Sequence, residues 1–161
     1  MRPWPTENPP LIGIIDNIRS LHNVGAIFRS ADGAGFGGLI LCGITAQPPR
    51  AEIRKSALGA EDFVPWRYEK NTADAIKSSR EAGYKIVALE CNSSSKPLAE
   101  FMPGEKTALV TGNEFYGLND EILQLCDEVR DLPMRGEKVS LNVSVAFGIA
   151  AYELAKHFDN K

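Results

Sequence analysis

The stretch that decides the fold is TALVTGNEFYGL, residues 107–118. The apolar run Thr107–Thr111 predicts a buried strand, which leads directly into an acidic loop flanked by glycines. Gly112 lets the backbone approach a ligand closely, and the carboxylate of Glu114 can accept hydrogen bonds from hydroxyl or amino groups. The stretch therefore predicts either a ligand-binding loop at the end of a strand or a plain turn with a solvated glutamate.

Short apolar runs alternate with amphipathic stretches on both sides of residues 107–118. Further strands are expected at 11–15, 39–42, 63–68 (a sheet edge), 84–89 and 128–132. Helices are expected at 23–34, 71–82, 119–126 and 141–157, with a short helix or turn at 53–60. This alternation predicts an α/β fold, a mostly parallel sheet with helices on both faces. Ligands bind outside the carboxyl ends of such strands, so the loops after Ile15, Thr111 and Leu132 are the candidate site.

The length of 161 residues fits a single domain, residues 11–161, preceded by a proline-rich arm, residues 1–10. The sequence shows no apolar stretch long enough for a membrane span and no apolar core of a signal peptide. Cys42, Cys91 and Cys126 lie far apart, a spacing that predicts neither a disulfide framework nor a metal site. We therefore expect a soluble, cytoplasmic protein without a metal and without membrane association.

The charge balance argues against a nucleic-acid partner. With 18 basic and 21 acidic side chains the formal net charge is −3, whereas contacts from Lys and Arg to phosphates supply much of the affinity for nucleic acids. A local basic patch can coexist with an acidic remainder. Seven basic residues of the N-terminal half are candidates for such a face: Arg19, Arg29, Arg50, Arg54, Lys55, Arg67 and Lys70.

The run GAGFGG, residues 33–38, matches the G-x-G-x-x-G pattern of dinucleotide-binding proteins. That pattern needs a strand before it and a helix after it, so that the helix N-terminus meets a pyrophosphate. Here a helix precedes the run and a strand follows it. The run therefore predicts a helix C-cap and a tight turn, and it gives little support to a nicotinamide-dependent dehydrogenase.

A second polar cluster is NIRSLHNVGAIFRSAD, residues 17–32. Asn23 stands where the helix is expected to begin, so it is either an N-cap or a site residue. At 100° per residue, Arg29 lies near Ala26 and Gly33 and away from the apolar side of the helix. Its small neighbours leave room for a substrate, although a solvated arginine is the ordinary alternative.

A third cluster is LPMRGEKVSLNVSVA, residues 132–146. Ser140 is a natural N-cap for the last helix. Asn142 enters a helix that is apolar nearly all round, so we expect its side chain to be partly buried and to need hydrogen-bond partners. The amount of apolar surface on this helix also suggests burial against a second subunit.

Together the three clusters resemble the signature motifs of the SpoU/TrmH family, within the SPOUT superfamily of RNA methyltransferases. The matching patterns are N-x-R-x-x-x-N-V-G-A-x-x-R-x-A-D, V-x-G-x-E-x-x-G-L and L-P-M-x-G-x-x-x-S-L-N-V-S-V-A. They occur in the family's order and spacing, and the resemblance covers residues 11–157.

The resemblance implies an α/β fold whose C-terminal segment is threaded into a deep trefoil knot. It implies S-adenosylmethionine as the cofactor, bound at the positions of Gly112, Leu132 and Leu141, with Thr111 and Met134 beside them. It also implies catalytic roles at the positions that match the family's polar residues: Arg29, Asn23, Glu114, Ser140 and Asn142. The implied substrate is a ribose 2′-hydroxyl of tRNA or rRNA, and the implied assembly is a homodimer joined near the knot and the C-terminal helix.

Two alternatives stay open beside this implied activity. One is a SPOUT methyltransferase that acts on a base, and the other is an RNA-binding or assembly factor that keeps the fold without catalysis.

An arginine is a poor general base because its pKa is far above neutral pH. We therefore expect Arg29 to hold a phosphate and to stabilise the developing alkoxide while water takes the proton. Many relatives carry an extra RNA-binding domain, whereas this sequence shows only the proline-rich arm beside the catalytic domain. The affinity for RNA is therefore expected to come from the catalytic domain itself.

Overall fold

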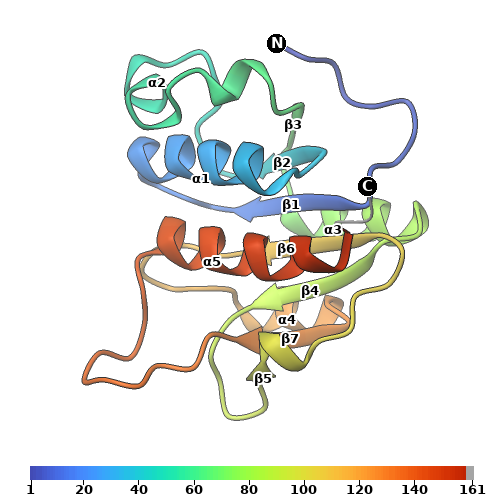
Figure 1. Ribbon diagram of the computed structural model, residues 1–161, viewed down its shortest axis with the longest axis vertical. Helices are drawn as coiled ribbons and strands as arrows, with labels where there is room; N and C mark the ends of the chain where they lie inside the picture. The colour runs from blue at the N-terminus through green and yellow to red at the C-terminus, as the bar shows by residue number, and fades with distance from the viewer. Residues whose placement is uncertain (159–161) are drawn as a thin grey trace.

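In the computed structural model, which describes residues 1–158, seven strands form one parallel sheet (Figure 1). They are β1 (Leu11–Asp16), β2 (Gly38–Cys42), β3 (Trp66–Glu69), β4 (Lys85–Leu89), β5 (Lys96–Pro97), β6 (Thr107–Thr111) and β7 (Glu128–Asp131). Their order across the sheet is β3-β2-β1-β6-β4-β7-β5, and every neighbouring pair is parallel. The predicted α/β class with a parallel sheet is confirmed.

Helices cover both faces of the sheet. They are α1 (Leu21–Ala34), α2 (Ala51–Ala57), α3 (Thr72–Glu81), α4 (Asp120–Leu125) and α5 (Val143–Ala155). Three short 3-10 turns, Ala60–Asp62, Leu98–Glu100 and Lys156–Phe158, complete the described elements. The helices α1, α2 and α5 pack on one face, and α3 and α4 pack on the other (Figure 1).

Alternation along β1 divides its side chains between the two layers of the core. Leu11 and Ile15 pack with α1 and α5, whereas Ile12 and Ile14 pack with α3. All six residues of β1 are buried because helices cover the strand on both sides. The strand therefore delivers its C-terminal loop from a rigid position at the centre of the sheet.

The element boundaries differ from the sequence-based ones where local periodicity is weak. The strand β5 was not predicted, because two residues are too short to show alternation. The glycine run 33–38 is the predicted cap and turn: Gly35 has a φ of 79° and its N–H donates to the carbonyls of Ala31 and Asp32. The threading of the C-terminal segment and the boundary at residue 10 stay predictions.

The proline-rich residues 1–10 are mostly exposed and contact the sheet through Trp4 and the Pro10 backbone. The Pro10 carbonyl accepts a hydrogen bond from Thr107 N at 2.8 Å, and Trp4 packs against the core layer under α3. The guanidinium of Arg67 lies 5.0 Å from the Trp4 ring centroid. No helix within residues 1–158 combines the length and the apolar character that a membrane crossing requires.

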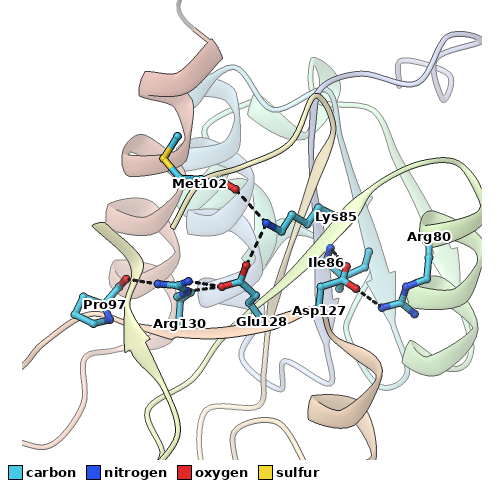
Figure 2. Close-up of polar contacts among 8 residues, drawn as sticks. All are labelled: Arg80, Lys85, Ile86, Pro97, Met102, Asp127, Glu128 and Arg130. Carbon is cyan, nitrogen blue, oxygen red and sulfur yellow. Dashed lines mark hydrogen bonds and ion pairs between the residues drawn. The ribbon is translucent and has the colours of Figure 1, made fainter. Parts of the chain in front are cut away.

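An ionic cluster fixes β7 between β4 and β5. Figure 2 shows Glu128 between Lys85, whose Nζ lies 3.1 Å from Oε2, and Arg130, which also donates to the Pro97 carbonyl at 3.2 Å. Hydrogen bonding from Arg130, followed by that from Lys85, holds the pKa of Glu128 below its ordinary value despite partial burial. Since β7 runs directly into Leu132, this cluster anchors one wall of the candidate site.

Replacing Arg130 with methionine is expected to lower the free energy of unfolding by about 1–3 kcal/mol, because Glu128 and the Pro97 carbonyl lose a donor that is largely buried. Urea denaturation measures this change. Arg50→Met is the matched control: its pair with Glu52 is exposed, so a change within about 0.5 kcal/mol is expected. Equal losses in both variants would contradict the assigned role of Arg130.

Candidate active site

A cavity of about 270 Å³ lies at the carboxyl edge of the sheet, where the loops after β4, β6 and β7 meet the start of α5. This is near the lower end of the about 300–1,000 Å³ typical of small-molecule sites. The structure places all five residues of the predicted cofactor set on its wall: Thr111, Gly112, Leu132, Met134 and Leu141. Glu114 and Ser140 also line it.

The loop after β4 contributes a wall that the sequence analysis missed. Leu89, Glu90 and Cys91 line the cavity. The Oε2 atom of Glu90 accepts a hydrogen bond from Leu118 N at 2.7 Å, and Glu90 N donates to the carbonyl of Arg130 at 3.0 Å. The available signal was a charged residue directly after a predicted buried strand, which ends at Leu89.

Two glycines are required by close packing in the loop after β6. A Cβ at Gly112 would lie 2.6 Å from the carbonyl carbon of Gly117 and 2.8 Å from Leu118 N, which are backbone atoms that cannot move aside alone. Gly117 has a φ of 63°, in the left-handed region, and a Cβ there would collide with the Glu90 carboxylate. The loop is thus packed tightly on itself and on Glu90 of the loop after β4.

The carboxylate of Glu114 joins this loop to the loop after β1. It accepts hydrogen bonds from Arg19 N at 2.8 Å, Ser20 N at 2.7 Å and Asn23 Nδ2 at 3.1 Å. Burial raises the pKa of the carboxyl, but these donors outweigh the burial, so the pKa of Glu114 lies below its ordinary value of 4.5. Glu114 is therefore a connector between two loops, and the alternative of a solvated turn residue is excluded.

Glu114→Gln is expected to lower the free energy of unfolding at neutral pH by about 1–3 kcal/mol, since the amide turns a donor toward backbone N–H groups. Because the folded-state pKa is depressed, the contribution of Glu114 is present above pH 4.5 and is lost as pH falls through the lower, folded value. Urea denaturation across this range should show the two proteins converging at acid pH. Glu105→Gln, at an exposed position, is expected to show no such convergence. A difference between wild type and Glu114→Gln that persists at acid pH would contradict this role.

Asn23 and Asn142 extend the connection to α5. Asn142 Nδ2 donates to Asn23 Oδ1 at 3.3 Å, and Asn23 in turn donates to Glu114. Asn23 is buried, but Asn142 is exposed, so the expectation of a partly buried Asn142 was wrong. Asn142 Oδ1 accepts hydrogen bonds from Ser144 N at 2.9 Å and Val145 N at 3.3 Å, and so caps the start of α5.

Both N-cap alternatives from the sequence were wrong. Ser20, and not Asn23, caps α1 by accepting a hydrogen bond from Asn23 N at 3.1 Å. Asn142, and not Ser140, caps α5. The displaced caps leave the Asn23 amide free to bind Glu114 and leave Ser140 on the cavity wall.

Arg29 is the one predicted site residue that the described chain does not bring to the cavity or to the chain of hydrogen bonds. It lies about 9 Å along α1 from Asn23, at the helical rise of 1.5 Å per residue. Its side chain is exposed and forms no ion pair within residues 1–158.

The expected basic face is only partly available. Arg50 pairs with Glu52, Arg54 pairs with Glu61 and Asp62, and Arg67 pairs with Glu69. These pairs neutralise three of the seven basic side chains that the sequence suggested for this face. The other four carry no such pair among the described residues: Arg19, Arg29, Lys55 and Lys70. Arg19 belongs to the loop that Glu114 holds.

The chemistry of the cavity is acidic and apolar. Among the described residues, Glu90, Glu114 and Asp131 line it together with leucine, valine and methionine side chains, and no lysine or arginine does. Such a wall disfavours a phosphate-bearing cofactor and suits a ligand with an apolar body and positive charge. A parallel sheet with this cavity at its carboxyl edge defines an α/β protein that binds a small molecule.

Comparison with known proteins identifies the class more closely. The SpoU rRNA Methylase family matches residues 10–152, so the chain belongs to this family. It is 34% identical over 150 residues to a 23S rRNA (guanosine-2′-O-)-methyltransferase RlmB from Burkholderia sp, covering 93% of this chain and 60% of the relative. The RlmB protein of Salmonella typhi is 35% identical over 147 residues, covering 91% and 60%.

Solved structures agree with this membership. An AdoMet-bound rRNA methyltransferase from Sinorhizobium meliloti superposes with a TM-score of 0.86 at 30% identity, covering 93% of this chain and 57% of that one. The TrmH/SpoU tRNA modifying enzyme of A. aeolicus gives 0.81 at 30% identity, covering 94% and 77%. The chain spans about 60% of the length of the curated relatives it matches.

Proposed function

We propose that this protein is an S-adenosylmethionine-dependent methyltransferase that modifies a ribose 2′-hydroxyl of RNA. The observation that carries the proposal is the acidic cavity, which no lysine or arginine of the described residues lines and whose Glu114 is joined by hydrogen bonds to Asn23 and through it to Asn142. The cofactor suits this wall because its sulfonium and ammonium groups outnumber its one carboxylate, which gives it a net positive charge, and because the faces of its adenine ring are apolar. The 2′-O-methyltransferases among the relatives support the same assignment, and rRNA is the substrate class they favour.

The residues around the cavity have separate tasks in this proposal. Gly112 and its neighbours present backbone groups to the cofactor, and Leu132, Met134 and Leu141 cover its apolar part. When bound, the cofactor supplies an electrophilic methyl group on sulfur. Holding the ribose oxygen in line with that methyl lowers the activation barrier by several kcal/mol. This positioning is the task of Asn23, Glu114 and Asn142 together with Ser140.

Arg29 is assigned to the RNA. Arg29 lies apart from the cavity of its own chain, so in this proposal it acts from the RNA side, where its guanidinium binds a phosphate beside the target ribose and stabilises the alkoxide that forms as water takes the proton. A planar, permanently charged group suits both contacts, whereas proton abstraction does not suit an arginine.

The test of the activity is incubation with methyl-labelled cofactor and separate rRNA and tRNA pools, followed by nucleoside mass spectrometry. A 2′-O-methylated nucleoside is the expected product. A base-methylated nucleoside would establish the base-modifying alternative. Absence of cofactor binding in calorimetry would contradict the proposed activity and revive the non-catalytic RNA-binding alternative.

The homodimer is also part of this proposal. Val145, Ile149 and Tyr152 of α5 are exposed and form, with Ala26 and Ser30 of α1, a shallow apolar face. A second copy of the chain packed on this face would bury those side chains.

Ile149→Glu is expected to convert the dimer to a monomer, because a carboxylate would be buried in an apolar contact. Sedimentation velocity at micromolar concentration measures the change. Leu58→Glu places the same charge on an exposed leucine away from α5 and should leave the dimer intact. A wild-type protein that sediments as a monomer would refute the dimer.

A further inference from the structure

Two aromatic side chains stand exposed at the cavity. Phe115 is 74% exposed and Tyr116 is 86% exposed, and both line the cavity from the loop after β6. Neither packs into a core cluster of the described chain. Exposed neighbouring aromatic rings beside a site indicate a surface for a ligand.

The backbone that carries these rings is held firmly. Asn113 Oδ1 accepts hydrogen bonds from Phe115 N at 2.9 Å and Tyr116 N at 3.1 Å. Asn113 Nδ2 donates to the carbonyl of Asn17 at 2.7 Å, which ties the turn to the loop after β1. The rings therefore extend from a braced turn, so little backbone ordering is needed when a ligand binds them.

A cation lies against the first ring. The guanidinium carbon of Arg19 is 5.6 Å from the Phe115 ring centroid, and the Arg19 side chain forms no ion pair among residues 1–158. Its backbone N–H is held by Glu114, which sets its position beside the loop. Flat aromatic rings next to an unpaired guanidinium match the two parts of a nucleotide, a base that stacks and a phosphate that is negative.

We infer that Phe115 and Tyr116 form a stacking platform for unpaired RNA nucleobases beside the target ribose, with Arg19 contacting the adjoining phosphate. This inference rests on the proposed function, whose RNA substrate it places against a named surface. Stacking also supplies affinity that does not depend on positive charge, which suits a protein with a net charge of −3. A protein surface would use the same rings without a preference for nucleobases.

The test is fluorescence anisotropy of the full chain, without cofactor, with labelled single-stranded oligoadenylate and with an abasic ribose-phosphate oligomer of the same length. The wild type should bind oligoadenylate more tightly than the abasic oligomer. Phe115→Ala and Tyr116→Ala should each weaken oligoadenylate binding by about 5- to 100-fold and leave abasic binding nearly unchanged. Phe115→Trp, which keeps a flat ring, should restore the preference for bases.

Phe63→Ala is the matched control. Phe63 is 57% exposed and has the Arg2 guanidinium 5.8 Å from its centroid, but it does not line the cavity. Equal binding of both oligomers by the wild type, or equal losses at Phe63 and Phe115, would overturn the inference. So would a change of sedimentation in the RNA-free Phe115→Ala protein, since the rings would then form a contact between protein chains. Because the cofactor is absent, a failure of methyl transfer by the wild type is a separate result that concerns only the proposed function.

Discussion

Replacing Arg29 with alanine is expected to reduce the turnover of RNA methylation by about 100- to 1,000-fold, the usual loss when one charge-stabilising donor is removed from a site. The exposed guanidinium forms no ion pair within the described chain, so its removal leaves no buried charge and should not unfold the protein. The loss should therefore appear in catalysis and not in stability. Transfer of labelled methyl groups to RNA at saturating cofactor measures it.

Arg29→Lys separates charge from shape. Lysine keeps the positive charge but loses the planar fork that grips a phosphate through two hydrogen bonds, so intermediate turnover is expected. Arg50→Ala is the control, because Arg50 is exposed and pairs with Glu52 away from the cavity. Full turnover in Arg29→Lys would exclude a need for the guanidinium, and full turnover in Arg29→Ala would remove Arg29 from the mechanism.

Gly112→Ala is expected to weaken cofactor binding, raising the dissociation constant at least about 10-fold, and to lower the free energy of unfolding by about 1–3 kcal/mol. The added Cβ meets backbone atoms of Gly117 and Leu118 at 2.6 and 2.8 Å, so the loop must open. Opening displaces Glu114 from the backbone donors of Arg19 and Ser20. Calorimetry with S-adenosylmethionine and urea denaturation measure the two effects.

Gly104→Ala is the matched control for this substitution. No heavy atom lies within 4 Å of the position that its Cβ would occupy, so the same added methyl group should change stability by no more than about 0.5 kcal/mol. Cofactor binding that is unchanged in Gly112→Ala would show that the loop tolerates opening or that the cofactor lies elsewhere.

The types of the elements and their order along the chain could be predicted from the sequence because each pattern extends over only a few residues. The strand β6 has the predicted bounds, Thr107–Thr111, and Gly35 caps the end of α1 as the local pattern of glycines indicates. The two-residue strand β5 has no periodicity to detect, and the insertion of β6 between β1 and β4 depends on long-range pairing. Local patterns therefore predicted the strands of the sheet but not the order in which they lie across it.

The candidate site divides in the same way. The sequence alone determined which loops carry polar residues, since a strand that ends in a glycine or a carboxylate is a local pattern. The tertiary structure decided what those residues bind: Glu114 receives donors from Arg19 and Ser20, 95 and 94 residues away, and Asn142 reaches Asn23 across 119 residues. It also brought Glu90 to the cavity, moved the caps to Ser20 and Asn142 and set Arg29 apart from the cavity. A hydrogen bond joins atoms that the fold brings within about 3 Å, and no local pattern records which distant atoms those are.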